Sequence, residues 1–238
     1  MKNAIVTGGT KGIGKAIVTM LLNEGYFVYV TYGSDDAAAE SASIEFQGIS
    51  ENFSVVKVNQ ADRDAVHSFT DSLKDVDLHC LVCNAGSTLR KPIMEISDSE
   101  WDTVMQIGVN SHFYMVRDLM QNIQSDSRII FIGSMMAVHP HATSLAYGTM
   151  KSAVHGLAMN LVKEFEGTGT TVNVIAPGFV ETEWQKNKPA AIRDNICKKT
   201  AIHRFAAPEE IADTTKFIIN NEFVNGSVIE VSGGYCYK

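Results

Sequence analysis

Short apolar runs alternate along the chain with longer stretches whose apolar residues recur at helical spacing. Each short run is almost continuously apolar, which predicts a strand that is buried on both faces. We expect strands at Asn3–Thr7, Phe27–Thr31, Ser54–Val58, Cys80–Cys83, Arg128–Ile132, Thr171–Ile175 and Ser227–Val231. The longer stretches predict amphipathic helices over Gly12–Asn23, Asp62–Leu73, Ser99–Ile123 and Tyr147–Glu166.

This alternation of strands and helices is typical of a parallel sheet that is covered by helices on both faces. About seven strands would make a doubly wound, Rossmann-type sheet, so we expect a single α/β domain over residues 1–238. The chain shows no internal repeat, low-complexity tract or linker. One long irregular stretch, at about 178–200, has the length of the loops that often serve as functional lids.

Composition and charge indicate where the protein is located and which kinds of partner it binds. The chain has 238 residues, 45% of them hydrophobic, and a formal net charge of −7. The start, MKNAIVTGG, is too short for the apolar region of a signal peptide, and no run approaches the ~18 apolar residues of a membrane span. We therefore expect a cytoplasmic protein without a membrane partner. The acidic balance also argues against nucleic acid as a partner.

Two cysteines, Cys80 and Cys83, form a C-x-x-C in LHCLVCNAG. A redox pair of this kind usually opens a helix, where the thiolate is stabilised. Here the pair lies in an apolar run that ends in Asn-Ala-Gly, which favours a buried strand. No second pair accompanies it, so we expect no metal site.

The segment TGGTKGIG, residues 7–14, lies between the first expected strand and the first expected helix. Glycine lets the backbone turn sharply and approach a phosphate, and the following helix offers free N–H groups. A dinucleotide site needs a glycine-rich turn at this place in the chain. We predict dinucleotide contacts from Gly8, Thr10, Lys11, Gly12, Ile13 and Gly14.

The end of the second strand tests which dinucleotide binds. NAD sites usually place an acid there, which binds the ribose 2′-hydroxyl. Here Tyr32 and Ser34 occupy that region, while Asp35 and Asp36 come later, as helix-capping or solvated charges. No carboxylate at the strand end would repel a 2′-phosphate, and Lys11 supplies a nearby cation. We predict NADP(H) in preference to NAD(H).

Tyr147 and Lys151 stand four residues apart in SLAYGTMKSAVHG. Residues at this spacing are neighbours on a helix surface, so two interpretations compete. The pair is either a half-buried aromatic beside a solvated charge, or a phenol and an ammonium held together for chemistry. On its own, the pair favours the first interpretation.

Further motifs follow one another in a characteristic order: TGGTKGIG, the NAG at 84–86, Asn110 in IGVNSHF, Ser134 in IFIGS, YGTMK at 147–151 and PGFVET at 177–182. In order and spacing, the chain resembles the short-chain dehydrogenases/reductases over essentially its full length. Its C-terminal half, with RFAAPEEIA and NGSVIEVSGGY, is most similar to the 3-oxoacyl-carrier-protein reductases of fatty acid biosynthesis. The resemblance implies an NAD(P)-dependent oxidoreductase acting on CH–OH groups.

The resemblance assigns catalytic roles to four residues. Tyr147 would be the general acid/base, and Lys151 would lower the pKa of its phenol and bind the nicotinamide ribose. A free tyrosine titrates near 10, so such a neighbour is needed for proton exchange near neutral pH. Ser134 would hydrogen-bond the substrate carbonyl, and Asn110 would support a water chain through Lys151.

The resemblance also adds cofactor contacts around the glycine loop. Asn84, Ala85 and Gly86 would approach the adenosine ribose, and Asn59 stands where many members carry an acid near the adenine. The nicotinamide carboxamide would be bound after the sixth strand, by Pro177, Gly178, Val180 and Thr182. Tyr147, Lys151, Tyr32 and Ser34 complete the expected set.

The implied activity is an NADPH-dependent ketoreductase acting on a 3-oxoacyl thioester. Alternatives are a dehydrogenase of another small alcohol or ketone (a sugar, polyol or cyclic alcohol) and a non-catalytic dinucleotide sensor. Carrier-protein reductases commonly display arginines at two docking positions, which here hold Ser125 and Thr168. Arg128 and Lys163 lie nearby as partial substitutes, so docking of an acyl carrier protein stays open.

The resemblance finally implies a homodimer or homotetramer that packs through the helices at about 99–123 and 147–166. We expect His155, one helical turn beyond Lys151, to be packed or to lie at a subunit interface.

Overall fold

The computed structural model describes residues 1–235, and within them seven parallel strands form one sheet in the order β3-β2-β1-β4-β5-β6-β7. Every neighbouring pair is parallel, as the alternating pattern predicted. The strands are β1 (Asn3–Val6), β2 (Phe27–Tyr32), β3 (Phe53–Lys57), β4 (Leu78–Cys83), β5 (Ile123–Ile132), β6 (Thr171–Pro177) and β7 (Val228–Val231). All seven expected strands are therefore confirmed, with shifts at their ends.

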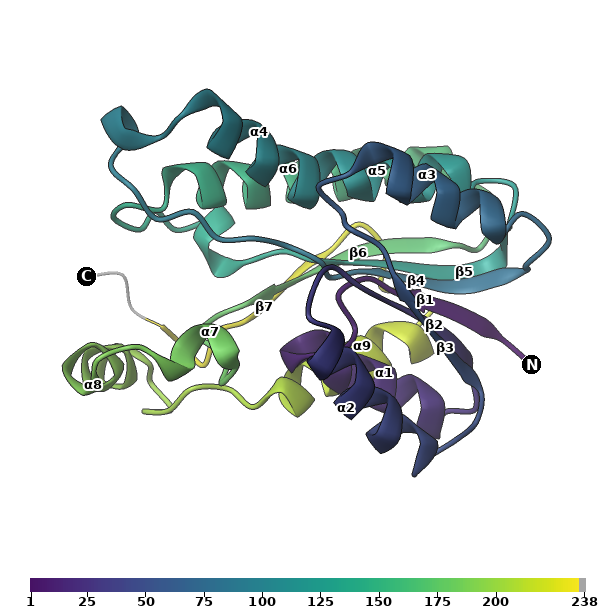
Figure 1. Cartoon of the computed structure of the whole chain (residues 1–238), viewed down its shortest axis with the longest axis horizontal. Helices are drawn as coiled ribbons and strands as arrows, with labels where there is room; N and C mark the ends of the chain where they lie inside the picture. The colour runs from purple at the N-terminus through teal and green to yellow at the C-terminus, as the bar shows by residue number, and fades with distance from the viewer. Residues whose placement is uncertain (236–238) are drawn as a thin grey trace.

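Helices cover both faces of the sheet (Figure 1). One face carries α3 (Arg63–Ser72), α4 (Asp98–Met105), α5 (Ser111–Asp118) and α6 (Leu145–Glu164). The other face carries α1 (Gly12–Asn23), α2 (Asp36–Gln47) and α9 (Pro208–Asn220). This is the doubly wound, Rossmann-type arrangement that was expected.

Both faces of the strands are buried, which explains their continuously apolar sequences. In β1, Ala4 and Val6 pack in the cluster that includes α1 and α9, whereas Ile5 packs in the cluster that includes α3, α5 and α6. Successive side chains of a strand point to opposite faces, so a sheet with two covered faces needs an apolar residue at every position.

One predicted helix is broken in two. The expected helix over Ser99–Ile123 consists of α4, a π-helical turn at Gln106–Asn110 and α5, and Ile123 already begins β5. The helix ends at Asp118 because the chain must turn into the strand. The Asn122 side-chain amide closes that turn by donating to the carbonyls of Leu73, Lys74 and Val76.

The stretch at about 178–200 is not irregular, contrary to expectation. It contains α7 (Glu183–Lys186) and α8 (Ala190–Lys199). Among the residues that the structure describes, α8 buries only Ile196 and α7 buries none. A helix with so little buried surface has no apolar stripe, so its sequence gives no helical periodicity.

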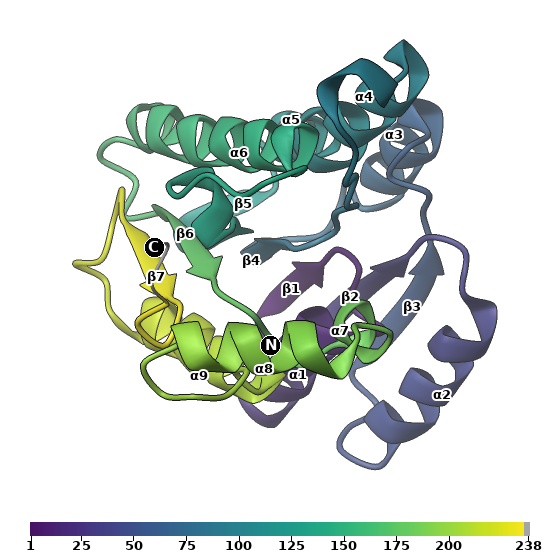
Figure 2. The same cartoon turned by 90° about the vertical axis from the view of Figure 1, so that its left-hand side faces the viewer.

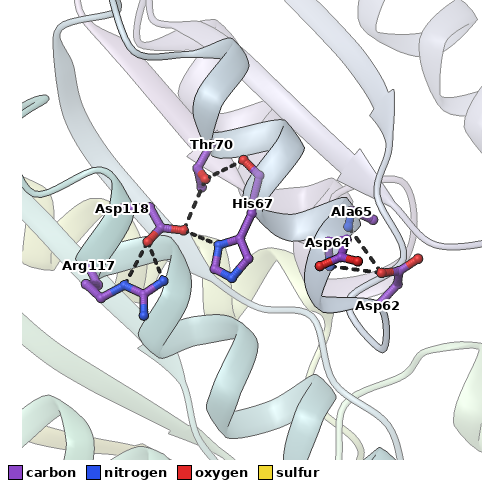
Figure 3. A network of polar contacts seen from close by, with 7 residues as sticks. All are labelled: Asp62, Asp64, Ala65, His67, Thr70, Arg117 and Asp118. Carbon is purple, nitrogen blue, oxygen red and sulfur yellow. Dashed lines mark hydrogen bonds and ion pairs between the residues drawn. The ribbon is translucent and has the colours of Figure 1, made fainter.

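Polar contacts fix α5 against α3 (Figure 3). The Asp118 carboxylate lies 2.6 Å from His67 Nδ1 and also accepts from Thr70 Oγ1 at 3.3 Å. Its second oxygen accepts from Arg117 Nε at 2.8 Å. These contacts hold in place the helix that follows the π-helical turn, and therefore the turn itself.

Within residues 1–235, no helix is long and apolar enough to cross a membrane, and no His, Cys, Asp and Glu side chains group as a metal site. Cys80 and Cys83 are buried in β4, as their apolar context predicted. Burial raises the pKa of the Cys80 thiol to about 12, so it stays protonated at neutral pH.

Candidate active site

The chemically interesting segments meet at one edge of the sheet. The glycine loop follows β1, Asn84–Gly86 follows β4, Ser134 follows β5, and residues 178–182 follow β6. Parallel strands bring their carboxyl ends to the same edge, which faces the viewer in Figure 2. The strand order also reverses between β1 and β4, and such a reversal opens the crevice in which α/β sheets bind ligands.

The glycine loop has a backbone that other residues would disrupt. Gly8 and Gly12 have positive φ angles of 63° and 51°, a region that favours glycine. A Cβ on Gly14 would overlap the carbonyl oxygen of Gly8. Because α1 begins at Gly12, the first N–H groups of that helix are exposed to a ligand at the loop. The loop therefore fits a phosphate closely.

Asn84 ties the glycine loop to the end of β4. Its side-chain amide donates to the carbonyls of Thr7 at 2.9 Å and Gly8 at 3.0 Å. The next residue, Ala85, donates its backbone N–H to the hydroxyl of Thr7 at 2.9 Å. Gly86 lies close to α6, since a Cβ on Gly86 would be 3.6 Å from Lys151 Nζ.

The segment after β6 lies against the same loop. A Cβ on Gly12 would lie 3.0 Å from Thr182 Cγ2. Val180 pairs with Ala206 in an isolated β-bridge. Gly178 packs against the backbone of Ser232, since a Cβ on Gly178 would lie only 2.8 Å from the Cα of Ser232. The structure thus gathers the expected cofactor residues at one edge of the sheet: Gly8–Gly14, Asn84–Gly86 and Pro177–Thr182.

Ser134, Tyr147 and Lys151 come together between β5 and α6. Ser134 caps the short 3₁₀ turn Met135–Ala137, and its hydroxyl accepts from the backbone of Met136 at 3.1 Å. Lys151 is buried, and its ammonium donates to the carbonyl of Ile132 at 2.6 Å. The same ammonium lies 5.9 Å from the centre of the Tyr147 ring. This arrangement favours the second interpretation of the Tyr147–Lys151 pair.

The electrostatics of the pair differ from expectation. Burial lowers the pKa of Lys151 to about 8. Burial also raises the pKa of Tyr147 above its usual value, although Ser134 and the nearby Arg90 guanidinium both act to lower it. Lys151 was expected to lower the pKa of this phenol. In this structure Lys151 is not among the groups that shift the pKa of the phenol, and its ammonium is directed at the Ile132 carbonyl.

Asn110 ends the π-helical turn that precedes α5. This turn contacts α6 closely, since a Cβ on Gly108 would overlap the thioether of Met150, the residue before Lys151. The Asn110 amide itself donates to Gln106 at 3.3 Å. The turn therefore places Asn110 beside the α6 segment of Lys151, but the side chains of the two residues are not bonded to each other.

Charged side chains surround the end of β2. Lys11 pairs with Asp35 at 2.7 Å, and Asp35 also caps α2 by accepting from the backbone N–H of Ala38. Lys57 pairs with Asp36 at 2.8 Å. Lys57 was not among the residues predicted from the sequence; the parallel register that pairs it with Tyr32 places it here.

The remaining expected residues at this end are more exposed. Tyr32 donates its hydroxyl to Asp36 at 3.0 Å, and Ser34 is exposed beside it. Asn59 follows β3 and accepts from the backbone N–H of Ala61 at 3.1 Å. Asp35 and Asp36 are thus each paired with a lysine, so the charges of these four side chains at the end of β2 cancel.

Arg128 cannot serve as a docking residue for a carrier protein. Its guanidinium is buried and donates to the backbone carbonyls of Ile219, Asp126 and Ser127. The expectation that it partly replaces a docking arginine is therefore wrong. Ser125 and Thr168 are exposed, as docking positions would be, and Lys163 is exposed nearby.

Comparisons with known proteins agree with this site. A family model described as short chain dehydrogenase matches residues 2–193. A 2-dehydro-3-deoxy-D-gluconate 5-dehydrogenase from Pseudoalteromonas atlantica is 30% identical, over 98% of this chain and 95% of the relative. A 3-oxoacyl-[acyl-carrier-protein] reductase FabG from Haemophilus influenzae is also 30% identical, over 98% of this chain and 97% of its own.

Solved structures show the same fold. A short chain dehydrogenase from Burkholderia cenocepacia in complex with NADP superposes with a TM-score of 0.92 at 25% identity, covering 98% of this chain and 97% of that one. BdcA in complex with NADPH gives 0.90 at 29% identity, covering 98% and 94%. The motifs, the sheet and these relatives together show that the chain belongs to the short-chain dehydrogenase/reductase family of oxidoreductases.

Proposed function

We propose that the protein is an NADPH-dependent ketoreductase in which Asn110, Ser134, Tyr147 and Lys151 carry the chemistry. The observation that supports this most directly is the buried Lys151 ammonium 5.9 Å from the centre of the ring of Tyr147, the phenol whose pKa Ser134 acts to lower. This group stands at the same sheet edge as a glycine loop whose backbone fits a pyrophosphate. A dinucleotide sensor would need only the loop.

In the proposed mechanism, bound NADPH supplies a hydride. The Ser134 hydroxyl orients the substrate carbonyl, and Tyr147 donates its proton to the carbonyl oxygen. Lys151 binds the ribose hydroxyls and stabilises the phenolate that remains, and the Asn110 turn connects Lys151 to water. The segments 84–86 and 177–182 hold ribose and nicotinamide, so that donor and acceptor carbon atoms meet at reacting distance.

The preference for NADPH rests on the end of β2. Lys11 and Lys57 both lie there, and their partners Asp35 and Asp36 are exposed side chains that a 2′-phosphate can displace. The Burkholderia and BdcA structures contain NADP and NADPH, which supports the same assignment for this chain.

Replacing Lys11 tests the cofactor assignment. Lys11→Ala is expected to weaken NADPH binding about tenfold, the effect of losing one charge-assisted contact, and to change NADH binding little. Asp35→Asn keeps the α2 cap but frees Lys11, so it should tighten NADPH binding. Calorimetric titration of both cofactors measures these effects. Tighter binding of NADH than NADPH by the wild-type protein would show that the assignment is wrong.

The substrate that we favour is a 3-oxoacyl thioester, as for the FabG relatives. The Tyr147 ring packs against a cluster of buried apolar side chains, an environment that suits an acyl chain. They are Met135, Met136, Phe179, Ile196 and Phe205. The reaction class is the firmer part of this proposal, since a sugar, polyol or cyclic alcohol would use the same four catalytic residues.

Uncompensated cations near this apolar cluster favour substrates with an anionic end. Burial lowers the pKa of Lys188, and the Arg90 and Arg193 guanidinium groups lower it further. Arg193 is paired with Glu181 and stacks on Phe205 at 4.4 Å. Within residues 1–235, the side chains of Arg90 and Lys188 have no carboxylate partner. Both the carboxylate of a keto acid and the phosphate of a pantetheine thioester have the chemistry to pair with them.

A matched substrate panel tests both parts of the proposal. NADPH oxidation is followed with carrier-bound and coenzyme A-bound 3-oxoacyl groups, with a neutral N-acetylcysteamine thioester, and with a 3-oxo acid and its methyl ester. Arg90→Gln should raise KM for the anionic compounds alone, whereas Lys186→Gln, a change on α7 nearby, should not. Equal KM changes for charged and neutral compounds would exclude an anion site. No turnover of any compound would exclude this ketoreductase activity.

We further propose a homodimer that forms through α5 and α6. An apolar groove runs between these helices, lined by Phe113, Val116, Arg117, Met120, Leu157, Asn160, Leu161 and Glu164. Light scattering at micromolar concentration should give the mass of a dimer or tetramer, and Leu161→Asp should shift it toward the monomer. A monomeric wild-type protein would contradict this expectation.

A further inference from the structure

His155 lies on α6, one turn beyond Lys151, and contacts the segment in which β5 ends. The backbone N–H of Ser134 donates to His155 Nε2 at 3.4 Å. One turn earlier, Lys151 donates to the carbonyl of Ile132. Two side chains of α6 therefore hold the two ends of the short segment Ile132–Ser134. This segment carries the serine of the proposed active site.

Gly133, at the centre of that segment, makes room for the imidazole. A Cβ at this position would overlap His155 Nε2. The φ angle of Gly133 is not positive, so the backbone itself would accept another residue. Its N–H donates to the carbonyl of Ile175 at 2.7 Å, which fixes the segment against β6. The absence of a side chain at Gly133 is thus explained by the space that His155 occupies.

The contact defines the protonation state of the ring. An acceptor at Nε2 requires a lone pair there, so the imidazole is neutral and carries its proton on Nδ1. Burial, and secondly the Lys151 ammonium, lower the pKa of His155 to about 4. The neighbours Ile132, Ser134, Val174 and Ile175 have no side chain that titrates near neutral pH. The ring therefore stays an acceptor at neutral pH.

We propose that His155 is a positioning residue whose neutral Nε2 fixes the main chain of Ser134 and thereby directs the serine hydroxyl toward Tyr147 and the substrate carbonyl. This inference rests on the proposed role of Ser134. The hydroxyl has its own anchor in the Met136 N–H, but that anchor belongs to the same turn and moves with it. His155 connects the turn to α6, which carries Tyr147 and Lys151, and so sets their relative position.

Two substitutions of His155 separate its acceptor from its bulk. His155→Leu keeps most of the volume but removes the acceptor, and should lower kcat about three- to tenfold, the effect of one ordinary hydrogen bond. KM and the Kd for NADPH should change little. His155→Gln places an amide oxygen near the position of Nε2, so it should restore most of kcat. Equal kcat values for wild type and His155→Leu would overturn the proposal.

The pH profile adds a readout that bulk packing would not move. Protonation of His155 would place an N–H opposite the N–H of Ser134, so wild-type kcat should fall as the pH falls through about 5 to 4. His155→Gln cannot ionise there, and its profile should lack this acid limb. Circular dichroism at each pH confirms that the protein stays folded. Identical acid limbs in both proteins would count against the proposed contact.

Two measurements need no turnover and therefore remain informative if the ketoreductase proposal fails. Nitrogen-15 NMR of the wild-type protein should show a neutral His155 with its proton on Nδ1 and a pKa below about 5. A proton on Nε2 at neutral pH would overturn the inference.

The second measurement is urea unfolding. Gly133→Ala should lower the free energy of unfolding less in a His155→Ala background than in the wild-type background, because the contact with Val174 is common to both backgrounds and cancels. Equal costs would show that the two residues are uncoupled.

Discussion

Tyr147→Phe is expected to lower kcat at least about a thousandfold and to change the Kd for NADPH by less than about twofold. Positioned proton transfer contributes typically 10²–10⁴-fold, and this substitution removes only the hydroxyl that performs it. The phenyl ring keeps its apolar contacts with the clusters around Met135 and Met150. Single-turnover kinetics with prebound NADPH isolates the chemical step.

A matched control is Tyr29→Phe, which removes a hydroxyl from β2, away from the Ser134–Tyr147 contact. It should leave kcat unchanged. If Tyr147→Phe retained more than about a tenth of the wild-type kcat, Tyr147 would not be the proton donor. The ketoreductase proposal would then need another acid.

Lys151→Met is expected to lower kcat about a hundredfold or more and to weaken NADPH binding, yet to stabilise the cofactor-free protein at pH 7. The ammonium is buried, and its pKa is lowered from 10.5 to about 8. At pH 7 the folded protein must hold a charge that burial disfavours. Each pKa unit corresponds to about 1.4 kcal/mol, and the lost bond to Ile132 reduces the gain, so we expect roughly 1–3 kcal/mol.

The size of this stabilisation depends on pH. Below about pH 8 both folded and unfolded chains carry the ammonium, so the cost of burying it is fully present. Between about pH 8 and 10.5 the unfolded chain binds more protons than the folded one, and the stability of the wild-type protein rises with pH. The advantage of Lys151→Met should therefore shrink toward pH 10. Each kcal/mol shifts Tm by about 2–4 °C in a domain of this size.

Thermal unfolding of both proteins at pH 7 and pH 10, without cofactor, measures this difference. Lys198→Met is a suitable control, because Lys198 is exposed on α8 and should not alter Tm. A lower Tm for Lys151→Met at pH 7 would show that the ammonium stabilises the fold. In that case its bond to Ile132 outweighs the cost of burial.

The fold could be predicted where burial imposes a strong pattern. The helix α1 has the predicted ends. Its buried residues Ile17, Val18, Leu21 and Leu22 follow one another at helical spacing, and Gly12 marks its start. In contrast, α8 buries only Ile196 among the described residues, and nothing in its sequence distinguishes it from a loop. The π-helical turn depends on the close approach of Gly108 to Met150, a tertiary contact that no local pattern encodes.

The site could be predicted as a set of residues but not as a set of interactions. Ser134 and Tyr147 were chosen together, and the structure brings them together. The direction in which the Lys151 ammonium points was not predictable, because it depends on a carbonyl at the end of a neighbouring strand. Lys57 was missed because its position beside Tyr32 depends on strand register. His155 was expected to be packed or to lie at a subunit interface; the structure shows it in contact with Gly133 and Ser134, and the interface stays a prediction.

The weak attachment of residues 183–199 has a consequence for how the enzyme can diversify. The helices α7 and α8 contribute a single buried side chain, Ile196, among the residues described, and it belongs to the apolar cluster against which Tyr147 packs. Exchanging this segment between relatives would disturb little of the core and would leave Ser134, Tyr147 and Lys151 in place. Under the proposed function, new substrates would be acquired by recombination in one short region, while the proposed catalytic residues would be inherited unchanged.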